Sequence, residues 1–317
     1  MKFAFLTDPL DHFKTYKDTT YAMMAEAARR GHEVYAFQQK DMAFNDGIVT
    51  ANVARIVLTG DASDWYHAEP AQAMQLNEFD AVKVRKDPPF DMEYVYLTYL
   101  LEAAERQGAR VFNRPGAIRS HNEKLAIAEF PQFISPTLVT SEVARIRAFH
   151  HVHKDIILKP LDGMGGVGIF RVKEDGLNLG SIIETLTANG AHTIMVQRFI
   201  PEIVQGDKRV LLIGGEVVPY CLARIPQGGE VRGNLAVGGL GVAQPISARD
   251  REIAEALAPL LLTRGLLLVG LDIIGNCMTE INVTSPTCFQ EIAQQTGFDV
   301  AGMFLDALEK QSNSLPI

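Results

Sequence analysis

The sequence is poor in cysteine, has no excess of basic charge and contains no long apolar run. Its three cysteines, Cys221, Cys277 and Cys288, are odd in number and lack C-x-x-C spacing, so neither a disulfide framework nor a zinc site is expected. The net charge of −8 argues against a nucleic acid or an anionic membrane as a partner of the whole chain. No stretch approaches the ~20 apolar residues that cross a bilayer.

The first residues also lack the features of a secretory signal, because the apolar run Lys2–Leu6 is short and leads directly into Asp8-Pro9. We therefore expect a cytoplasmic, reducing location. With 47% hydrophobic and 21% charged residues among 317, the composition is typical of a globular protein with sizeable cores. The length allows two or three domains.

The first 119 residues alternate between strand and helix patterns. Apolar runs at Lys2–Leu6 and Glu33–Phe37 predict strands, and Asp18-Thr19 is a capping signal for a helix between them. This β-α-β order predicts a parallel sheet with a right-handed crossover. Further strands are expected at Asn52–Leu58, Ala81–Val84 and Arg110–Phe112, and a helix at Asp91–Gln107.

Two further units follow. Residues 120–200 are predicted to form a small α+β or α/β lobe that opens with a helix at Ser120–Phe130. Residues 201–317 open with a hairpin whose Gly214-Gly215 turn is of the primed kind. The glycine-rich segment Ile225–Gly241 comes next, and so long a loop inside a compact domain is expected to be a lid or disordered.

The segment Asp155–Val172 reads DIILKPLDGMGGVGIFRV, an apolar run that ends in Lys159 and is followed by a glycine loop and a second β-prone run. Glycines let a backbone approach an anion closely and present N–H groups to it. A lysine supplies a point charge for the same anion. The pattern predicts a hairpin lid over phosphates, with Gly163, Gly165 and Gly166 at its tip. An ordinary hairpin turn with a surface lysine is the alternative.

Two better-known phosphate loops do not fit this segment. Gly163, Gly165 and Gly168 match the spacing G-x-G-x-x-G, but a dinucleotide site needs a helix directly after the glycines, and Ile-Phe-Arg-Val follows instead. A P-loop needs G-K-[ST] before a helix, and the chain contains no such triplet. The lid hypothesis is therefore kept.

Oxygen ligands for a metal gather near the C-terminal end. Asp272 lies in the apolar run LLLVGLDII, where an unpaired carboxylate is costly. Glu280 and Asn282 lie two residues apart and face the same way on a strand. Together they offer hard ligands that suit Mg²⁺ on substrate phosphates. We predict a three-residue turn, Gly275-Asn276-Cys277, which sets Asp272 across from Glu280. A two-residue turn would point them to opposite faces. The alternative for the three residues is a strand-end acid and two surface polar residues.

Arginines at strand ends are candidates for an acidic substrate, because a guanidinium can hold a carboxylate through two hydrogen bonds and α/β proteins bind ligands at strand ends. Arg85 and Arg224 each end a predicted strand, although each alone could be a surface salt bridge. Pro286, between Ser285 and Thr287, fixes a loop whose hydroxyls and amides could bind a carboxylate. The other basic candidates are Lys124, Lys208, Arg209 and Arg232.

Taken together, these features resemble the ATP-grasp superfamily and, within it, the bacterial glutathione synthetases, over essentially the whole chain. The segments that carry the resemblance are Val84–Asp91, Asn122–Lys124, Ile156–Gly166, Asp207–Val210, Val218–Gly233, Val269–Gly275 and Thr279–Cys288. The resemblance implies an α/β ATP-grasp fold with three parts. These are an N-terminal parallel-sheet α/β domain (1–119), a small central lid domain (120–200) and a C-terminal mixed α+β domain (201–317).

The resemblance also implies an activity, the ATP-dependent joining of the cysteinyl carboxylate of γ-glutamylcysteine to the amine of glycine through an acyl phosphate, with release of ADP and phosphate. A closed lid would protect such an intermediate from water. The implied partners are these small molecules and ATP, with no nucleic acid or membrane. Mg²⁺ is the implied cofactor, with Mn²⁺ as an alternative, and the implied assembly is a homotetramer.

By position, the resemblance assigns roles to individual residues. ATP would be bound by Lys124, Lys159, Gly163, Met164, Gly165, Gly166, Gln197, Arg198, Phe199, Ile200 and Asp207, and Mg²⁺ by Asp272, Glu280 and Asn282. Arg209 and Arg224 would steady the transferring phosphoryl group and the carboxylate, and Arg232 would act from the lid. The dipeptide would be bound by Arg85, Ser285, Pro286 and Thr287. Relatives carry a basic lid residue where this chain has Leu240, which gives Arg232 more weight.

Two rival hypotheses stay open. One is an ATP-grasp ligase for a different carboxylate and amine, against which the segments Arg85–Phe90 and Ser285–Cys288 argue. The other is a nucleotide-binding regulator that has lost turnover. Loss of a metal carboxylate or of a lysine would favour the regulator, and the chain has all four such residues, Asp272, Glu280, Lys124 and Lys159.

Overall fold

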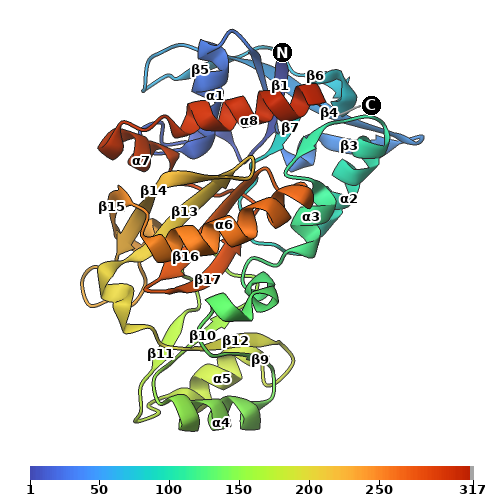
Figure 1. The fold of residues 1–317 in the computed structure, drawn as a ribbon. Helices are drawn as coiled ribbons and strands as arrows, with labels where there is room; N and C mark the ends of the chain where they lie inside the picture. The colour runs from blue at the N-terminus through green and yellow to red at the C-terminus, as the bar shows by residue number, and fades with distance from the viewer. Residues whose placement is uncertain (315–317) are drawn as a thin grey trace.

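The computed structural model describes residues 1–314. Three β-sheets follow one another along the molecule, and each has its own helices (Figure 1). The N-terminal sheet lies at one end, a five-stranded sheet from the last third of the chain lies in the middle, and a small lobe lies at the other end (Figure 1). The order in space therefore differs from the order in sequence.

The N-terminal sheet is built around four parallel strands in the order β2-β1-β7-β8. They are β1 (Lys2–Leu6), β2 (Glu33–Phe37), β7 (Ala81–Val84) and β8 (Val111–Phe112). Helices α1 (Thr19–Arg29) and α2 (Met92–Arg106) begin after Asp18 and Asp91, whose carboxylates each accept a hydrogen bond from a backbone N–H of the first turn. The strands and helices predicted for this parallel part are confirmed.

The sheet is mixed, however, rather than wholly parallel. Strand β4 (Ile48–Leu58) pairs antiparallel with β2, and also with β3 (Met42–Asn45), β5 (Tyr66–Ala68) and β6 (Gln72–Gln75). The β3–β4 hairpin turns at Asp46-Gly47, where both residues have positive φ, 48° and 85°. An Asp-Gly pair is the usual signal for such a turn, and the strand predicted at Asn52–Leu58 is only the second part of β4.

The small lobe is a four-stranded antiparallel sheet in the order β11-β10-β12-β9, with α4 (Val143–His153) and α5 (Leu179–Thr187) on one face (Figure 1). Its strands are β9 (Thr137–Thr140), β10 (Ile156–Pro160), β11 (Phe170–Val172) and β12 (Ile194–Arg198). Leu158 and Val196 of the sheet pack with Ile146 and Ile183 of the helices. Strands β10 and β11 form the predicted hairpin, with the glycine loop as its connection.

The helix predicted over Ser120–Phe130 is wrong. Helix α3 (Pro115–Ser120) ends where that helix was expected to begin, and a turn and a 3-10 helix (Leu125–Glu129) follow. The side-chain oxygen of Asn122 accepts hydrogen bonds from the backbone N–H of Lys124 (3.2 Å) and of the next residue (2.8 Å). Such local bonds offer the backbone an alternative to a helix, and here they fix the position of Lys124.

The middle sheet is antiparallel, with the order β15-β14-β13-β16-β17. Its strands are β13 (Asp207–Ile213), β14 (Glu216–Ile225), β15 (Leu240–Pro245), β16 (Leu268–Ile274) and β17 (Cys277–Asn282). The Gly214-Gly215 turn between β13 and β14 has φ values of 59° and 84°, as expected for the predicted primed turn. Helix α6 (Ala248–Thr263) covers one face, and α7 (Phe289–Thr296) and α8 (Val300–Ser314) follow β17 (Figure 1).

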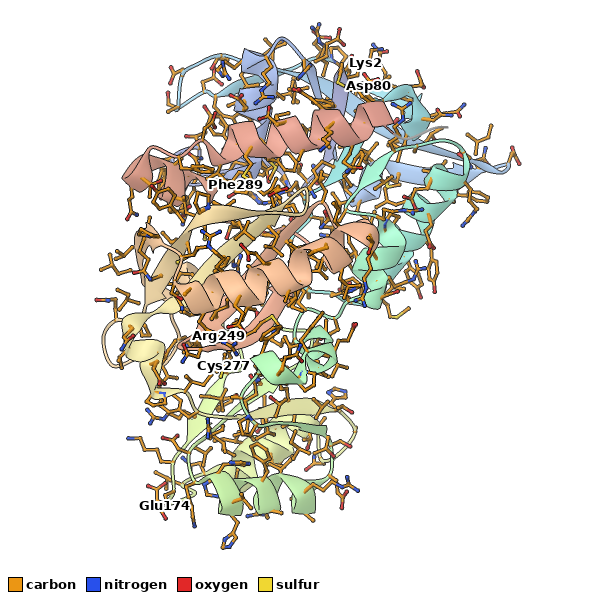
Figure 2. All side chains as sticks on the ribbon, in the orientation of Figure 1. Lys2, Asp80, Glu174, Arg249, Cys277 and Phe289 are labelled. Carbon is orange, nitrogen blue, oxygen red and sulfur yellow. The ribbon has the colours of Figure 1, made fainter. Side chains whose placement is uncertain are left out.

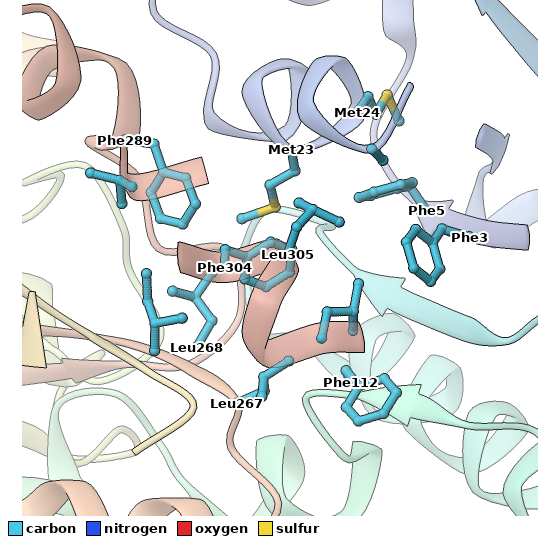
Figure 3. Close-up of a cluster of buried hydrophobic side chains, with 14 of the residues drawn as sticks. Phe3, Phe5, Met23, Met24, Phe112, Leu267, Leu268, Phe289, Phe304 and Leu305 are labelled. Atoms are coloured by element: carbon cyan, nitrogen blue, oxygen red, sulfur yellow. The ribbon is translucent and has the colours of Figure 1, made fainter. Parts of the chain in front are cut away.

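The last helix joins the middle sheet to the N-terminal sheet. Figure 3 shows Phe304 of α8 in a cluster of buried side chains that also contains Met23 of α1 and Leu268 of β16. On the outer side, Arg30, which follows α1, lies 2.7 Å from the carboxylate of Asp306. Helix α8 thus belongs to a core that two sheets share.

The β16–β17 hairpin sets the register of the predicted metal ligands. Its turn has two residues, Gly275-Asn276, rather than the predicted three. A β-bulge at Thr279 adds one residue to β17, so that Asp272 still pairs with Glu280. The turn prediction is wrong, whereas the pairing is confirmed. Figure 2 shows Cys277, which follows this turn, at the end of the middle sheet that faces the small lobe.

Candidate active site

Two adjoining cavities lie between the small lobe, the middle sheet and a loop of the N-terminal sheet. The predicted residues that line the first cavity are Lys124, Lys159, Gly163, Met164, Gly165, Gly166, Gln197, Arg198, Phe199, Ile200, Asp207, Arg232, Asp272 and Glu280. Those that line the second are Lys124, Gly163, Met164, Gly165, Arg209, Arg224, Glu280, Asn282, Ser285 and Thr287. The structure thus brings together all the predicted site residues except Arg85 and Pro286, and the basic candidate Lys208 also lines neither cavity because it pairs with Asp250.

Two lysines and one carboxylate meet at the boundary between the cavities. The Nζ atoms of Lys124 and Lys159 each lie 3.6 Å from Glu280 Oε1. Lys124 Nζ also donates to Gly163 O (2.5 Å), and Lys159 Nζ donates to the carbonyl of the bulge residue Thr279 (3.3 Å). Burial lowers the pKa of Lys159, while Glu280 opposes this effect and Lys124 adds to it. Two cations beside one carboxylate leave an excess of positive charge, which suits a polyphosphate.

One wall of the first cavity is the end of β12 and the residues after it, Gln197–Ile200. The side chain of Gln197 is held by a hydrogen bond from its Nε2 to Thr137 Oγ1 at 3.0 Å. Apolar side chains continue this wall, namely Ile157, Ile169 and Ile203. An apolar slot of this kind can hold a flat heterocycle such as a purine base.

The carboxylate of Asp207 is buried against the first cavity. Its Oδ2 accepts a hydrogen bond from Arg224 Nη2 at 2.5 Å, whereas its Oδ1 has no hydrogen-bond partner within the described part of the chain. Burial raises the pKa of Asp207 to about 6, against the opposing effect of Arg224. A buried carboxylate oxygen in a cavity wall, with a shifted pKa, is a candidate acceptor for a ligand hydroxyl or amine.

Arg209, Arg224 and Asp272 form a buried ion-pair network beside the second cavity. Arg209 Nε and Nη2 lie 2.5 and 3.1 Å from the two carboxylate oxygens of Asp272, and Arg224 Nη2 lies 2.9 Å from Asp272 Oδ2. Burial alone would raise the pKa of Asp272, but the two guanidinium groups hold it well below its usual range. The network therefore fixes the orientation of both arginines where they line the cavity.

The loop after β17 gives the second cavity its hydroxyl groups, from Thr284, Ser285 and Thr287. Glu123 holds this loop, because its Oε1 accepts hydrogen bonds from the backbone N–H (3.0 Å) and the hydroxyl (2.9 Å) of Thr284. Glu123 directly precedes Lys124 in the chain. One short segment thus fixes both the lysine at the boundary and the hydroxyl-bearing loop.

Arg85 and Pro286 line neither of the two cavities. Arg85 is 5% exposed, and it donates from Nη1 to Pro286 O at 2.9 Å and from Nε to Thr20 Oγ1 at 3.0 Å. This geometry departs from the direct substrate contact that was predicted for Arg85. Instead, its guanidinium holds the backbone of the loop from behind, and Ser285 and Thr287 reach the cavity.

The glycine loop and the predicted lid touch over the first cavity. Arg232 Nη1 donates to Gly166 O at 3.2 Å. Gly166 has φ +83°, and a Cβ there would lie 2.8 Å from Asn234 Oδ1, so only glycine fits this contact. The irregular segment is shorter than expected, because Leu240 already belongs to β15 and pairs with Ile225.

Asp272, Glu280 and Asn282 carry the oxygen atoms that could hold a hard divalent cation, and both oxygens of Asp272 also accept hydrogen bonds from Arg209 and Arg224. All three lie on the paired strands β16 and β17, and carboxylate and amide oxygens are the ligands that Mg²⁺ prefers. Asn282 Nδ2 donates to Gly270 O at 3.1 Å, which leaves the amide oxygen to act as a ligand. Within residues 1–314 no group of three or more His, Cys, Asp or Glu is arranged for a metal. The donor set of two acids and one amide therefore suits a cation that also keeps phosphate or water oxygens.

Several lining residues were not among the predicted site residues. They include Asp87, Pro88, Glu123, Asn234, Leu235, Ala236, Thr279, Thr284 and Cys288. Glu123 and Thr284 had a sequence signal, since they adjoin the predicted Lys124 and Ser285. Asp87 follows β7 in the segment Arg85–Phe90, which the resemblance singled out, but no local pattern could place it beside the loop that follows β17.

Solved structures share this architecture. D-cycloserine synthetase DcsG has a TM-score of 0.70 and 16% identity, over 98% of this chain and 100% of that chain. The ATP-grasp ligase PsnB, solved with a minimal precursor, has a TM-score of 0.65 and 19% identity over 98% of both chains. These identities show the fold alone. The chain therefore has the ATP-grasp fold.

Sequence comparison shows the family. Residues 1–119 match the prokaryotic glutathione synthetase N-terminal domain, and residues 123–297 match the prokaryotic glutathione synthetase ATP-grasp domain. The glutathione synthetase of Ralstonia nicotianae is 62% identical over 310 residues, which cover 98% of this chain and 96% of that protein. The chain belongs to the prokaryotic glutathione synthetase family. None of the helices described here is both long and apolar enough to cross a bilayer.

Proposed function

We propose that the chain makes glutathione by joining the cysteinyl carboxylate of γ-glutamylcysteine to the amine of glycine, with ATP converted to ADP and phosphate. The observation that carries the proposal is the boundary that the two cavities share, which includes Lys124, Glu280 and the glycine loop. A phosphoryl donor in the first cavity and a carboxylate in the second meet there. The 62% identical relative named glutathione synthetase supports this choice of substrates.

In the first half-reaction the substrate carboxylate attacks the γ-phosphoryl group, which gives an acyl phosphate and ADP. Lys124 and Lys159 neutralise phosphate oxygens, and the glycine loop covers them with backbone N–H groups. Arg209 and Arg224, held in place by Asp272, face the acid. Reactions of this kind depend mainly on positioning and on neutralisation of charge.

Asp272, Glu280 and Asn282 are the residues that would hold a divalent cation, Mg²⁺ first and Mn²⁺ as the alternative. When bound, the cation supplies neutralisation of the phosphate charge. The network around Asp272 and the lysines beside Glu280 orient these carboxylates before any substrate arrives.

In the second half-reaction the glycine amine attacks the acyl carbon, and a tetrahedral intermediate then loses phosphate. Water would destroy the acyl phosphate, so the site must be covered during its lifetime. The contact between Arg232 and Gly166 brings the two covering segments together over the first cavity. Arg232 therefore acts from the lid as a closing contact, with its guanidinium paired to Glu230 at 2.9 Å.

The experiment that tests this function measures phosphate release from ATP and Mg²⁺ with γ-glutamylcysteine alone, with glycine alone and with both, and identifies the products by mass. We expect release to require both substrates and to yield the tripeptide. Release with another acid and amine would keep the ligase mechanism and replace the substrates. Tight ATP binding without release for any pair would favour a nucleotide-binding regulator.

Three broader properties complete the proposal. We divide the chain into domains at residues 1–119, 120–200 and 201–317, with α8 packed back on the first of them. A homotetramer is the assembly that the family resemblance implies, and light scattering of the purified protein measures it. A cytoplasmic location is the third property, and cell fractionation tests it.

A further inference from the structure

Three carboxylates line the second cavity, and two of them are already engaged by the protein. Glu280 Oε1 lies between the boundary lysines, 3.6 Å from each Nζ. Glu123 accepts hydrogen bonds from the loop after β17. Asp87 differs, because it has no ion-pair partner within residues 1–314 and accepts a hydrogen bond from the hydroxyl of Ser285. It is also exposed. The Arg85 guanidinium acts on it electrostatically without forming an ion pair, so a carboxylate with no direct cationic contact among the described residues lies at the edge of this cavity.

The basic residues that precede Asp87 are directed to other partners. Lys86 Nζ lies 3.3 Å from the carboxylate of Asp8, and the guanidinium of Arg85 donates to Thr20 and to Pro286 O. The loop is held firmly, since the backbone N–H of Asp87 donates to Asp8 Oδ2 at 2.8 Å. The carboxylate of Asp87 is therefore presented to the cavity by its own backbone and by the loop after β17.

Asp87 lies away from the reacting end of the cavity. The boundary residues, which include Lys124, Glu280 and the glycine loop, line both cavities, whereas Asp87 and Ser285 line only the second. A dipeptide whose cysteinyl carboxylate reaches the boundary extends its γ-glutamyl end into the part that only the second cavity contains. That end carries an α-ammonium group, the one fixed cation of the acid substrate.

We propose that Asp87 binds the α-ammonium group of the γ-glutamyl residue, and that it thereby selects acids that carry a free amine at that end. The inference rests on the proposed function. An ammonium group has three hydrogen-bond donors and no acceptor, so a carboxylate without a cationic partner is its natural complement. The glycine amine is not this cation, because it must reach the acyl carbon at the boundary between the cavities.

The test compares γ-glutamylcysteine with glutarylcysteine, in which hydrogen replaces the ammonium group, in wild-type protein, Asp87→Asn and Asp87→Glu. In the wild type we expect kcat/KM to be about 10- to 100-fold lower for glutarylcysteine, the range for loss of a charge-assisted hydrogen bond. Asp87→Asn should lower kcat/KM for γ-glutamylcysteine to nearly the value that the wild type has for glutarylcysteine. The kcat/KM for glutarylcysteine itself should not change in this variant. Asp87→Glu keeps the charge and should retain part of the preference. The KM values for ATP and glycine should stay constant.

Asp8→Asn is the matched control, because it loosens the same loop without removing the charge in the cavity. It should affect γ-glutamylcysteine and glutarylcysteine equally. If Asp87→Asn lowers kcat/KM equally for both acids, the inference is overturned. Asp87 would then only support Ser285 or balance the charge of Arg85. A raised KM for glycine, or a wild type that does not discriminate between the acids, would also overturn it. A wild type that makes no tripeptide refutes the proposed function itself, and is thereby distinguished from these outcomes.

Discussion

Replacement of Asp272 by asparagine removes the central negative charge of the buried network and keeps the shape of the side chain. Asp272 is 2% exposed, and its oxygens lie 2.5 and 3.1 Å from Arg209 and 2.9 Å from Arg224. An amide can accept one of these hydrogen bonds, but it cannot balance two guanidinium charges. The variant therefore leaves the arginines with Asp207 as their remaining carboxylate.

The expected loss follows from the burial of the pair. Removal of one partner from a buried ion pair costs about 3–5 kcal/mol, a large part of the ~5–15 kcal/mol that stabilises a folded domain. The arginines depress the pKa of Asp272 below its ordinary value of 3.8. Its contribution to the free energy of unfolding is therefore fully present well above that value and is lost as the pH falls through the depressed pKa. The difference between wild type and Asp272→Asn should be constant near neutral pH and should narrow only below about pH 4.

Urea unfolding at several pH values measures this difference, and steady-state kinetics at several Mg²⁺ concentrations measure the effect on turnover. We expect kcat to fall by on the order of a hundredfold or more, as when one preorganised electrostatic contact is removed from an active site. Asp250→Asn is the matched control. Asp250 is fully buried and forms an ion pair with Lys208. Lys208 precedes Arg209 on β13, so its side chain points to the opposite face of the sheet from that of Arg209.

The control variant should lose stability to a similar degree and keep its kcat and its Mg²⁺ dependence. Wild-type unfolding of Asp272→Asn would refute the ion-pair argument. Equal losses of activity in both variants would show that instability, rather than the loss of a charge at the site, explains the effect.

Three further changes test other parts of the site. Glu280→Gln should cut turnover about a hundredfold with the fold intact, and unchanged rates at all Mg²⁺ concentrations would contradict its metal role. Arg232→Ala should bind ATP normally in calorimetry but form product more slowly, and a wild-type rate would refute the lid interpretation. Burial raises the pKa of Asp207 to about 6. Because its carboxylate accepts a hydrogen bond from a ligand best when it is ionised, the affinity for ATP should rise about tenfold between about pH 5 and 7. Asp207→Asn should lack this rise, and identical pH profiles for the two proteins would exclude the assignment.

Much of the site could be predicted because its parts are short and local. The lysine and the glycine loop occupy one hairpin, β10 to β11, and spacing alone shows that Glu280 and Asn282 share a face. The helix predicted at Ser120–Phe130 failed for an equally local reason, since the side chain of Asn122 captures backbone N–H groups that a helix would have used. That competition depends on geometry that helix propensity does not record.

The register of the acids shows the limit of such reasoning. The pairing of Asp272 with Glu280 was predicted from a three-residue turn, but the structure achieves it with a two-residue turn and a bulge at Thr279. The bulge also aims the Thr279 carbonyl at Lys159, which lies 120 residues earlier. A bulge that orients a distant side chain is set by the packing of the whole sheet, so the turn sequence alone does not reveal it.

Residue chemistry and short spacing were enough to predict the kinds of groups at the candidate site, namely lysines and glycines for phosphates, oxygen ligands for a metal and arginines for an acid. Which of these groups meet depends on the tertiary structure. It turned Arg85 toward Pro286, 201 residues away, and brought Asp87 to Ser285, 198 residues away. Contacts of this kind form because separate sheets bury apolar faces against shared helices such as α8. The hydrophobic effect that drives this packing is not directional. The sequence around the polar residues therefore does not show which of them the packing brings together.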